Sequence, residues 1–253
     1  MLEAEMSFVE DLGSVMDVAE GMLRSLSNNL SDSAVVGELT SRSNREENGY
    51  VSNDDVRQRW DGLRQSSWPR ITYTDAISLL QAKSDLLGCK PPTWGDGLQA
   101  EHEKFLASYV GGGAKPVFVV NYPRDIKAFY MRASQSAASP NPAHLGTTVD
   151  CFDLLVPELC EIAGGSMREH RLEPLLAAMK RQGPANPAGT SGQISGEQTQ
   201  GAPLEWYTDL RRYGCPPHGG FGLGFDRLLC YLSGVSTVRD IVAFPRWHGR
   251  CDC

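Results

Sequence analysis

CFDLLVPELCEIAGGSMRE, residues 151–169, is the stretch that decides the fold of this chain. Two apolar runs, Val149–Val156 and Leu159–Ala163, flank Pro157, a pattern that predicts two antiparallel strands joined by a tight turn. Their aliphatic and aromatic residues place these strands in a well-buried part of a sheet.

The segments around this hairpin extend the same sheet. Pro116–Tyr122 and Lys127–Arg132 are short and rich in β-branched or aromatic residues, and the PRDI between them predicts a second hairpin. Helical spacing of apolar residues recurs at about 10–26, 98–109 and 169–181. Adjacent hairpins flanked by helices predict an α+β fold with an antiparallel sheet rather than a doubly wound parallel one.

Length and composition limit the class of protein. The chain has 253 residues, of which 41 % are hydrophobic, enough for one large domain with a sizeable core. Its formal net charge of −7, without a block of Lys or Arg, makes it a poor general binder of nucleic acid. No apolar run reaches the roughly 18 residues of a membrane-spanning helix, so no membrane partner is expected. Seven cysteines without a CxxC pair favour a reducing compartment over a zinc site or a disulfide framework.

Three polar stretches interrupt the regular pattern and predict insertions in a single domain that covers residues 1–253; residues 27–53 of the first stretch are expected to be exposed. They lie at about 27–68, 135–146 and 182–203, and are rich in Ser, Asn, Gly, Pro or acidic residues. Within the first stretch, Val56, Trp60 and Leu63 predict a short helix.

Asp153 and Glu161 are the first candidate functional pair. Two carboxylates on neighbouring strands of a hairpin can converge on a hard cation such as Mg²⁺ bound to phosphate oxygens. Their apolar neighbours favour burial, which is costly for a carboxylate without a cationic partner. The alternative interpretation is a pair of solvated carboxylates, the usual state of such side chains.

Arg168 follows Gly164-Gly165 and is the second candidate. The glycines leave backbone open to a ligand, and the guanidinium offers a planar donor fork to a carboxylate or carboxamide oxygen. The alternative is a surface arginine at the start of a helix.

GFGLGFDR, residues 220–227, is the third candidate, a glycine-rich strand that runs into a helix. Gly220, Gly222 and Gly224 alternate and are expected to leave one face bare for a flat ligand such as a base, with Arg227 in reach of a phosphate. The spacing is neither the dinucleotide-binding fingerprint nor a Walker A loop. Close packing of strand against helix is the alternative.

Several motifs, in this order, resemble the catalytic core of class II aminoacyl-tRNA synthetases of the aspartate/asparagine/lysine branch, and specifically the asparaginyl-tRNA synthetases. GFGLGFDR looks like motif 3 of class II, with Asp226 where Glu is usual, and CEIAGGSMRE has Cys160 where Gly is usual. The matching segments are MLEAEMSF, RITYTDAI, WGDGLQAEHEKFLA, PVFVVNYPRDIKAFYMR, FDLLVPELCEIAGGSMREHRL, EWYTDLRRYG, PHGGFGLGFDRL and VRDIVAFPR.

The resemblance implies a function and a role for each candidate. The family uses ATP and Mg²⁺ to activate asparagine as asparaginyl-adenylate and then transfers it to tRNA(Asn). Asp153 and Glu161 match the acids that hold the Mg²⁺, and Arg168 matches the arginine that binds the asparagine side-chain oxygen. Arg227 matches the motif 3 arginine that stacks on adenine and meets the γ-phosphate. Gly222 and Gly224 match positions beside the nucleotide. The same resemblance implies that Arg227 and Glu161 are the catalytic residues.

The resemblance also sets expectations about organisation. The chain is expected to be a partial, N-terminally truncated catalytic domain that begins just after motif 2, without motif 1 or the anticodon-binding OB-fold. The family forms homodimers through motif 1. The insertions and the ending FPRWHGRCDC resemble organellar forms, which suggests the mitochondrial matrix, with the cytoplasm as the alternative. The alternative function is a truncated or degenerate synthetase-like protein that binds or regulates without charging tRNA.

Overall fold

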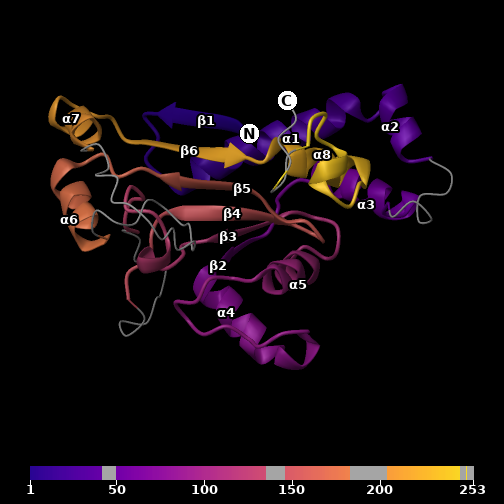
Figure 1. Cartoon of the computed structure of the whole chain (residues 1–253), viewed down its shortest axis with the longest axis horizontal. Helices are drawn as coiled ribbons and strands as arrows, with labels where there is room; N and C mark the ends of the chain where they lie inside the picture. The colour runs from indigo at the N-terminus through magenta and orange to yellow at the C-terminus, as the bar shows by residue number, and fades with distance from the viewer. Residues whose placement is uncertain (42–49, 135–145, 183–203, 246–248, 250–253) are drawn as a thin grey trace.

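A six-stranded sheet forms the centre of the molecule, in the order β1-β6-β5-β4-β3-β2 (Figure 1). The computed structural model describes residues 1–41, 50–134, 146–182, 204–245 and 249. The strands are β1 (Leu2–Ser7), β2 (Arg70–Thr72), β3 (Val117–Val120), β4 (Cys151–Val156), β5 (Cys160–Met167) and β6 (His218–Leu223).

The sheet is antiparallel as expected except for one pair at its edge, which makes it a mixed sheet. Every neighbouring pair is antiparallel except β2 and β3, which run parallel with Ile71 opposite Val119. A parallel pair needs a long crossover, and two helices between these strands supply it. The α+β class and the β4–β5 hairpin are confirmed.

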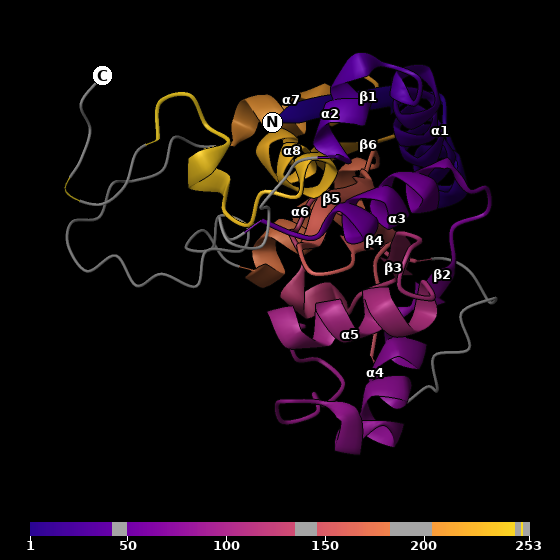
Figure 2. The same ribbon diagram turned by 90° about the vertical axis from the view of Figure 1, so that its right-hand side faces the viewer.

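Helices cover both faces of the sheet (Figure 2). Helices α1, α3 and α8 lie on one face, while α4 and α5 pack on the other, against β2, β3, β4 and β5. Helices α6 and α7 pack on each other at the end of the sheet opposite α3 and α8 (Figure 1). The helices are α1 (Leu12–Leu30), α2 (Ala34–Leu39), α3 (Asn53–Arg64), α4 (Tyr73–Ala82), α5 (Ala100–Val110), α6 (Leu172–Gln182), α7 (Glu205–Arg212) and α8 (Phe225–Ser233). Within the described part of the chain, none is both long and apolar enough to cross a bilayer.

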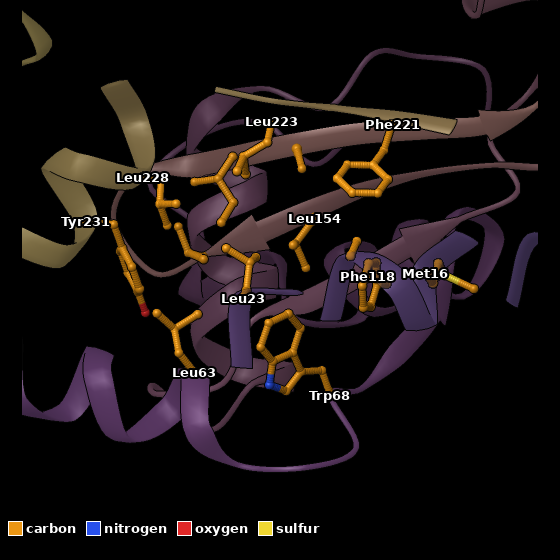
Figure 3. Packing of buried hydrophobic residues seen from close by; sticks show 14 of the residues in the cluster. Met16, Leu23, Leu63, Trp68, Phe118, Leu154, Phe221, Leu223, Leu228 and Tyr231 are labelled. Atoms are coloured by element: carbon orange, nitrogen blue, oxygen red, sulfur yellow. The ribbon is translucent and has the colours of Figure 1, made fainter. Parts of the chain in front are cut away.

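The sheet separates two apolar clusters. The larger one packs Phe118, Leu154 and Phe221 of the sheet against side chains of α1, α3 and α8, among them Leu23 and Leu63 (Figure 3). The smaller one packs Val119, Cys151 and Leu155 against α4 and α5. Because β4 contributes alternately to both clusters, all six of its residues are buried.

Part of the predicted insertion at 27–68 belongs to the core, and the short helix expected from Val56, Trp60 and Leu63 is present as α3. Residues 42–49 lie outside the described residues, but α3 buries Val56, Trp60 and Leu63 in the larger cluster. The indole nitrogen of Trp60 donates to the carbonyl of Leu232 at 2.9 Å, which ties α3 to α8. The expected insertions at 135–146 and 182–203 lie almost entirely outside the described residues.

The prediction that Lys127–Arg132 forms a hairpin with the preceding strand is wrong. Arg124–Ile126 forms a 3₁₀ turn, and the chain then crosses to the end of β5, where Met131 bridges Arg168 and the Arg132 N–H donates to Met167. The aromatic pattern of this segment reflects packing at a loop, since β3 already pairs with β2 and β4.

Candidate active site

A cavity of about 560 Å³ opens on the sheet face that carries α4 and α5. This volume lies within the range of small-molecule sites. Its lining brings together four of the predicted residues, Asp153, Glu161, Arg168 and Gly222, from three different strands and the end of β5. The remaining lining residues are Met1, Glu3, Ala4, Glu5, Lys127, Tyr130, Met131, Gly164, Gly165 and Phe221.

Glycines form the floor of this cavity. The strand register places Glu3, Gly222, Gly164 and Asp153 side by side on β1, β6, β5 and β4. At about 4.8 Å per strand, this row spans roughly 14 Å, with two bare positions between the two acids. The predicted bare face therefore exists. In this row it consists of two glycines, Gly222 of β6 and Gly164 of β5. Gly220 does not contribute, since the carboxylate of Glu5 lies over it.

A β-bulge brings Glu161 to the same face as Asp153. Gly164 pairs with Asp153 and Ala163 with Leu154, but Leu155 pairs with Glu161, so Ile162 is the extra residue. In a regular strand Glu161 and Gly164, three residues apart, would face opposite sides of the sheet. The bulge inverts that alternation and turns Glu161 toward the cavity.

The two carboxylates converge above Gly164. A Cβ atom on this glycine would lie 2.8 Å from Glu161 Oε1 and 3.5 Å from Asp153 Oδ1. Among the described residues there is no group of three or more His, Cys, Asp or Glu side chains with the arrangement of a metal site. Two carboxylates nevertheless fit Mg²⁺, which keeps several waters and takes its other ligands from substrate phosphates.

Lys127 neutralises Asp153. Its Nζ donates to Asp153 Oδ1 at 2.9 Å and to Oδ2 at 2.7 Å, and lies 4.0 Å from the centre of the Tyr122 ring. Burial acts to lower the pKa of Lys127, but the negative charges around it, Asp153 first, outweigh burial and raise that pKa. The ammonium therefore stays charged within the site.

A third carboxylate, that of Glu103 on α5, lies beside the pair. Its Oε2 accepts the backbone N–H of Glu161 at 3.3 Å. Burial, and then the charges of Glu161 and Asp153, raise the pKa of Glu103 to about 7. Burial and the charge of Asp153 also raise the pKa of Glu161. Acids whose pKa values rise together share an excess of negative charge, which a bound cation would relieve.

Arg168 is held in place by Glu5 and Ser166. Its Nε and Nη2 each donate to a carboxylate oxygen of Glu5 at 3.1 Å, and its Nη1 donates to Ser166 Oγ at 2.7 Å. The guanidinium also lies over the Tyr130 ring, 5.2 Å from its centre. These contacts use three of the five N–H donors of the side chain.

Gly224 and Arg227 lie beside the cavity rather than in its lining. Gly224 precedes α8, and its N–H donates to Ile162 at 2.8 Å. Arg227, in the first turn of α8, donates from Nη1 to the carbonyl of Glu161 at 2.6 Å. Both residues therefore hold the bulge of β5 against the start of α8.

Sequence reasoning assigned no role to Lys127, Glu103 or Glu5. All three stand in quoted motifs, but an isolated Lys or Glu carries no local signal of its partner. The partner of Lys127 is 26 positions away and that of Arg168 is 163 positions away. Such contacts follow only from the order of the strands.

These features, an α+β sheet with paired acids, an arginine and a glycine floor, agree with the family that the chain matches. The model of the family "tRNA synthetases class II (D, K and N)" matches residues 1–248, and the chain belongs to this family.

Within the family, the similar curated proteins are asparagine–tRNA ligases. The chain is 39 % identical to that of Clostridium tetani over 254 residues, which is 100 % of this chain and 47 % of the relative. It is 44 % identical to that of Legionella pneumophila over 195 residues, or 77 % of this chain and 36 % of the relative. The chain thus spans about half the length of the relatives it matches.

Similar solved structures are also asparaginyl-tRNA synthetases. The asparaginyl-tRNA synthetase of Pyrococcus horikoshii, complexed with asparaginyl-adenylate, superposes with a TM-score of 0.71 at 30 % identity, over 98 % of this chain and 47 % of that one. The enzyme of Entamoeba histolytica with the same adenylate gives a TM-score of 0.70, also at 30 % identity and over the same shares of the two chains. The fold is that of the synthetase catalytic domain.

Proposed function

We propose that the full-length protein is an asparagine–tRNA ligase and that this chain carries the site that activates asparagine. The observation that supports this most is the convergence of Asp153 and Glu161 above Gly164, within a cavity that Arg168 also lines. In the reaction, the asparagine carboxylate attacks the α-phosphate of ATP and pyrophosphate leaves. The acyl group of the adenylate then passes to the 3′ end of tRNA(Asn), and AMP leaves.

Charge supports a divalent cation as part of this proposal. The side chains that line the cavity include four carboxylates and two cations, and both cations already pair with carboxylates of the cavity. A triphosphate would meet net repulsion there. Asp153 and Glu161 would hold Mg²⁺, which when bound neutralises phosphate charge. The chain's own part is to keep the two carboxylates on one face.

Arg168 and Glu5 form the proposed asparagine subsite. Because Glu5 and Ser166 fix the guanidinium, the two remaining N–H donors of Arg168 have a set direction before a ligand arrives. The oxygen of the asparagine carboxamide accepts from them. A held arginine loses little side-chain freedom on binding, which favours affinity.

Gly222 and Gly224, with Arg227, form the proposed nucleotide subsite. Gly222 has no side chain to fill the floor of the cavity, and Arg227 stands next to Glu161 at the start of α8. Arg227 would release the Glu161 carbonyl to stack on adenine and meet the γ-phosphate. Positioning and charge neutralisation then supply most of the catalysis.

Exchange of labelled pyrophosphate into ATP tests the proposal. We expect exchange that depends on asparagine and is not supported by aspartate or lysine, measured with a longer protein that carries the remaining domains. Glu161→Gln should abolish exchange with the fold intact by circular dichroism. Binding of Mg·ATP and asparagine without exchange by the longer protein would instead favour a binding or regulatory role.

A homodimer and a mitochondrial location remain proposals that rest on resemblance. Sedimentation of the longer protein tests the dimer. Fractionation of cells against a matrix marker tests the compartment, and recovery in the cytosol would support the alternative location.

A further inference from the structure

Lys127 differs from Arg168, the other cationic residue in the cavity lining, in the carboxylate that it pairs with. Its ammonium contacts both oxygens of Asp153, at 2.9 and 2.7 Å, so no oxygen of that carboxylate is left without a cation. Arg168, by contrast, pairs with Glu5, which is remote from the Asp153–Glu161 pair in the register of the sheet. Lys127 therefore stands where a divalent cation would have to bind.

The backbone of Lys127 and its ammonium are held by different partners. The carbonyl of Lys127 accepts from Gln182 Nε2 at 2.7 Å, and its N–H donates to Arg124 at 3.3 Å. Beyond these bonds, the four-carbon stem ends in a compact charge that packs on the Tyr122 ring at 4.0 Å. The contacts of the ammonium with Asp153 and Tyr122 are thus separate from the hydrogen bonds that hold the backbone of Lys127.

We propose that Lys127 is the resident counter-ion of Asp153, and that a divalent cation binds the Asp153–Glu161 pair by displacing its ammonium. This inference rests on the proposed metal site. The ammonium and a divalent cation cannot share the same two oxygens, because like charges at contact distance repel strongly in a partly buried site. Once displaced, the ammonium still lines the cavity and is directed to phosphate oxygens that arrive with the cation.

Binding of Mn²⁺ to the chain, followed by electron paramagnetic resonance at pH 8 without ATP, asparagine or tRNA, tests the competition. We expect Lys127→Met to bind Mn²⁺ about tenfold more tightly than the wild type, since a competing cation is gone. Lys127→Arg keeps the charge and should behave like the wild type. Lys90→Met, which removes an exposed lysine, is the matched control.

Equal or weaker Mn²⁺ binding by Lys127→Met would overturn the inference. Absence of Mn²⁺ binding in every variant would overturn it as well, together with the metal site. Neither result depends on catalysis, so both are distinct from a failure of pyrophosphate exchange, which bears on the proposed function.

Labelling of lysines in the wild type gives a second test that needs no variant. Acetylation by a short pulse of reagent, read by mass spectrometry, should increase at Lys127 when Mn²⁺ is added, because the ammonium leaves its ion pair. Acetylation at exposed Lys90 should not change. Constant labelling of Lys127 at saturating Mn²⁺ would show that the cation binds without displacing it.

Discussion

Arg168 contacts three neighbours before any ligand arrives: the Glu5 carboxylate, the Ser166 hydroxyl and the Tyr130 ring. A planar guanidinium makes these contacts at once and still offers two N–H donors. A lysine in its place offers a single point of charge and cannot keep the same geometry. The residue thus combines a structural task with the proposed recognition of asparagine.

Arg168→Lys should raise the KM for asparagine roughly 10- to 100-fold in pyrophosphate exchange, the effect of losing hydrogen bonds that involve a charged group. The KM for ATP should change far less, because the proposed nucleotide subsite lies at Gly222 and Arg227. Arg239→Lys, at a 3₁₀ turn near the C-terminus, is the control. Equal effects on both substrates would make Arg168 a structural residue.

Glu103 makes stability depend on pH in metal-free buffer. Burial and the charges of Glu161 and Asp153 raise the pKa of Glu103 to about 7 in the folded protein, whereas an unfolded Glu titrates near about 4.3. The folded state binds this proton more tightly, so its contribution is fully present below about pH 4.3 and is lost as the pH rises through about 7.

Glu103→Gln keeps a neutral group at every pH. In urea unfolding with EDTA, the free energy of unfolding of this variant relative to the wild type should increase between pH 5 and pH 8. Glu101→Gln, two residues earlier on α5 at an exposed position, should show no such trend. A difference that stays constant with pH would refute the assignment.

At the scale of the element, strand β5 has a separate task on each face. Gly165 meets the Phe152 ring on the core side, and Ala163 and Met167 join the larger cluster. Gly164 and Glu161 face the cavity, and only the bulge at Ile162 makes this combination possible. One extra residue in one strand therefore creates the carboxylate pair.

Gly164→Ala should weaken cation binding at the site while leaving the stability of the fold nearly unchanged. The added Cβ would lie 2.8 Å from Glu161 Oε1, at the far end of a flexible side chain, so the carboxylate must move while the backbone need not. We expect Mn²⁺ to bind at least about tenfold more weakly, with a free energy of unfolding within about 1 kcal/mol of the wild type.

Gly97→Ala is the matched control for that substitution, because a Cβ there meets nothing within 4 Å. Unchanged Mn²⁺ affinity in Gly164→Ala would mean that the two carboxylates need not meet above the glycine, and it would count against the metal site.

Across the whole molecule, the sheet is shared by two apolar clusters that pack on opposite faces. The polar stretch at 27–68 contributes to one of them, since α3 packs on α1 and α8. Arg59 reinforces this packing: it donates to the carbonyl of Tyr231 at 3.1 Å and pairs with Glu158 in the turn between β4 and β5. The segment thus supports the hairpin that carries the acids.

Leu63→Ala should lower the free energy of unfolding by about 2–5 kcal/mol, the range for truncating a buried leucine. Leu63 is 0 % exposed. Unfolding should remain a single transition in thermal melts, because α3 is part of a shared core. Val35→Ala, which removes an exposed side chain, should change stability by less than about 0.5 kcal/mol. A loss of less than about 0.5 kcal/mol for Leu63→Ala would show that α3 does not contribute to the core.

Much of the architecture and the proposed chemistry was predictable from the sequence. The apolar runs around Pro157 predicted the β4–β5 hairpin, and the spacing of apolar residues predicted helices α1, α3, α5 and α6. These signals are local, because period and turn residues act within one element. The motif resemblance predicted the family and named Asp153, Glu161 and Arg168, which the cavity brings together.

The arrangement of the site depended on tertiary structure. Strand alternation alone would place Glu161 and Gly164 on opposite faces, and only the pairing of β5 with β4 shows that Ile162 bulges. In the same way, the sheet order brings Glu5 of β1 to Arg168, and a loop mistaken for a strand brings Lys127 to Asp153. The physical reason is that hydrogen bonds and charges between distant segments fix the strand register and the ion pairs. A local pattern of side chains does not specify these contacts.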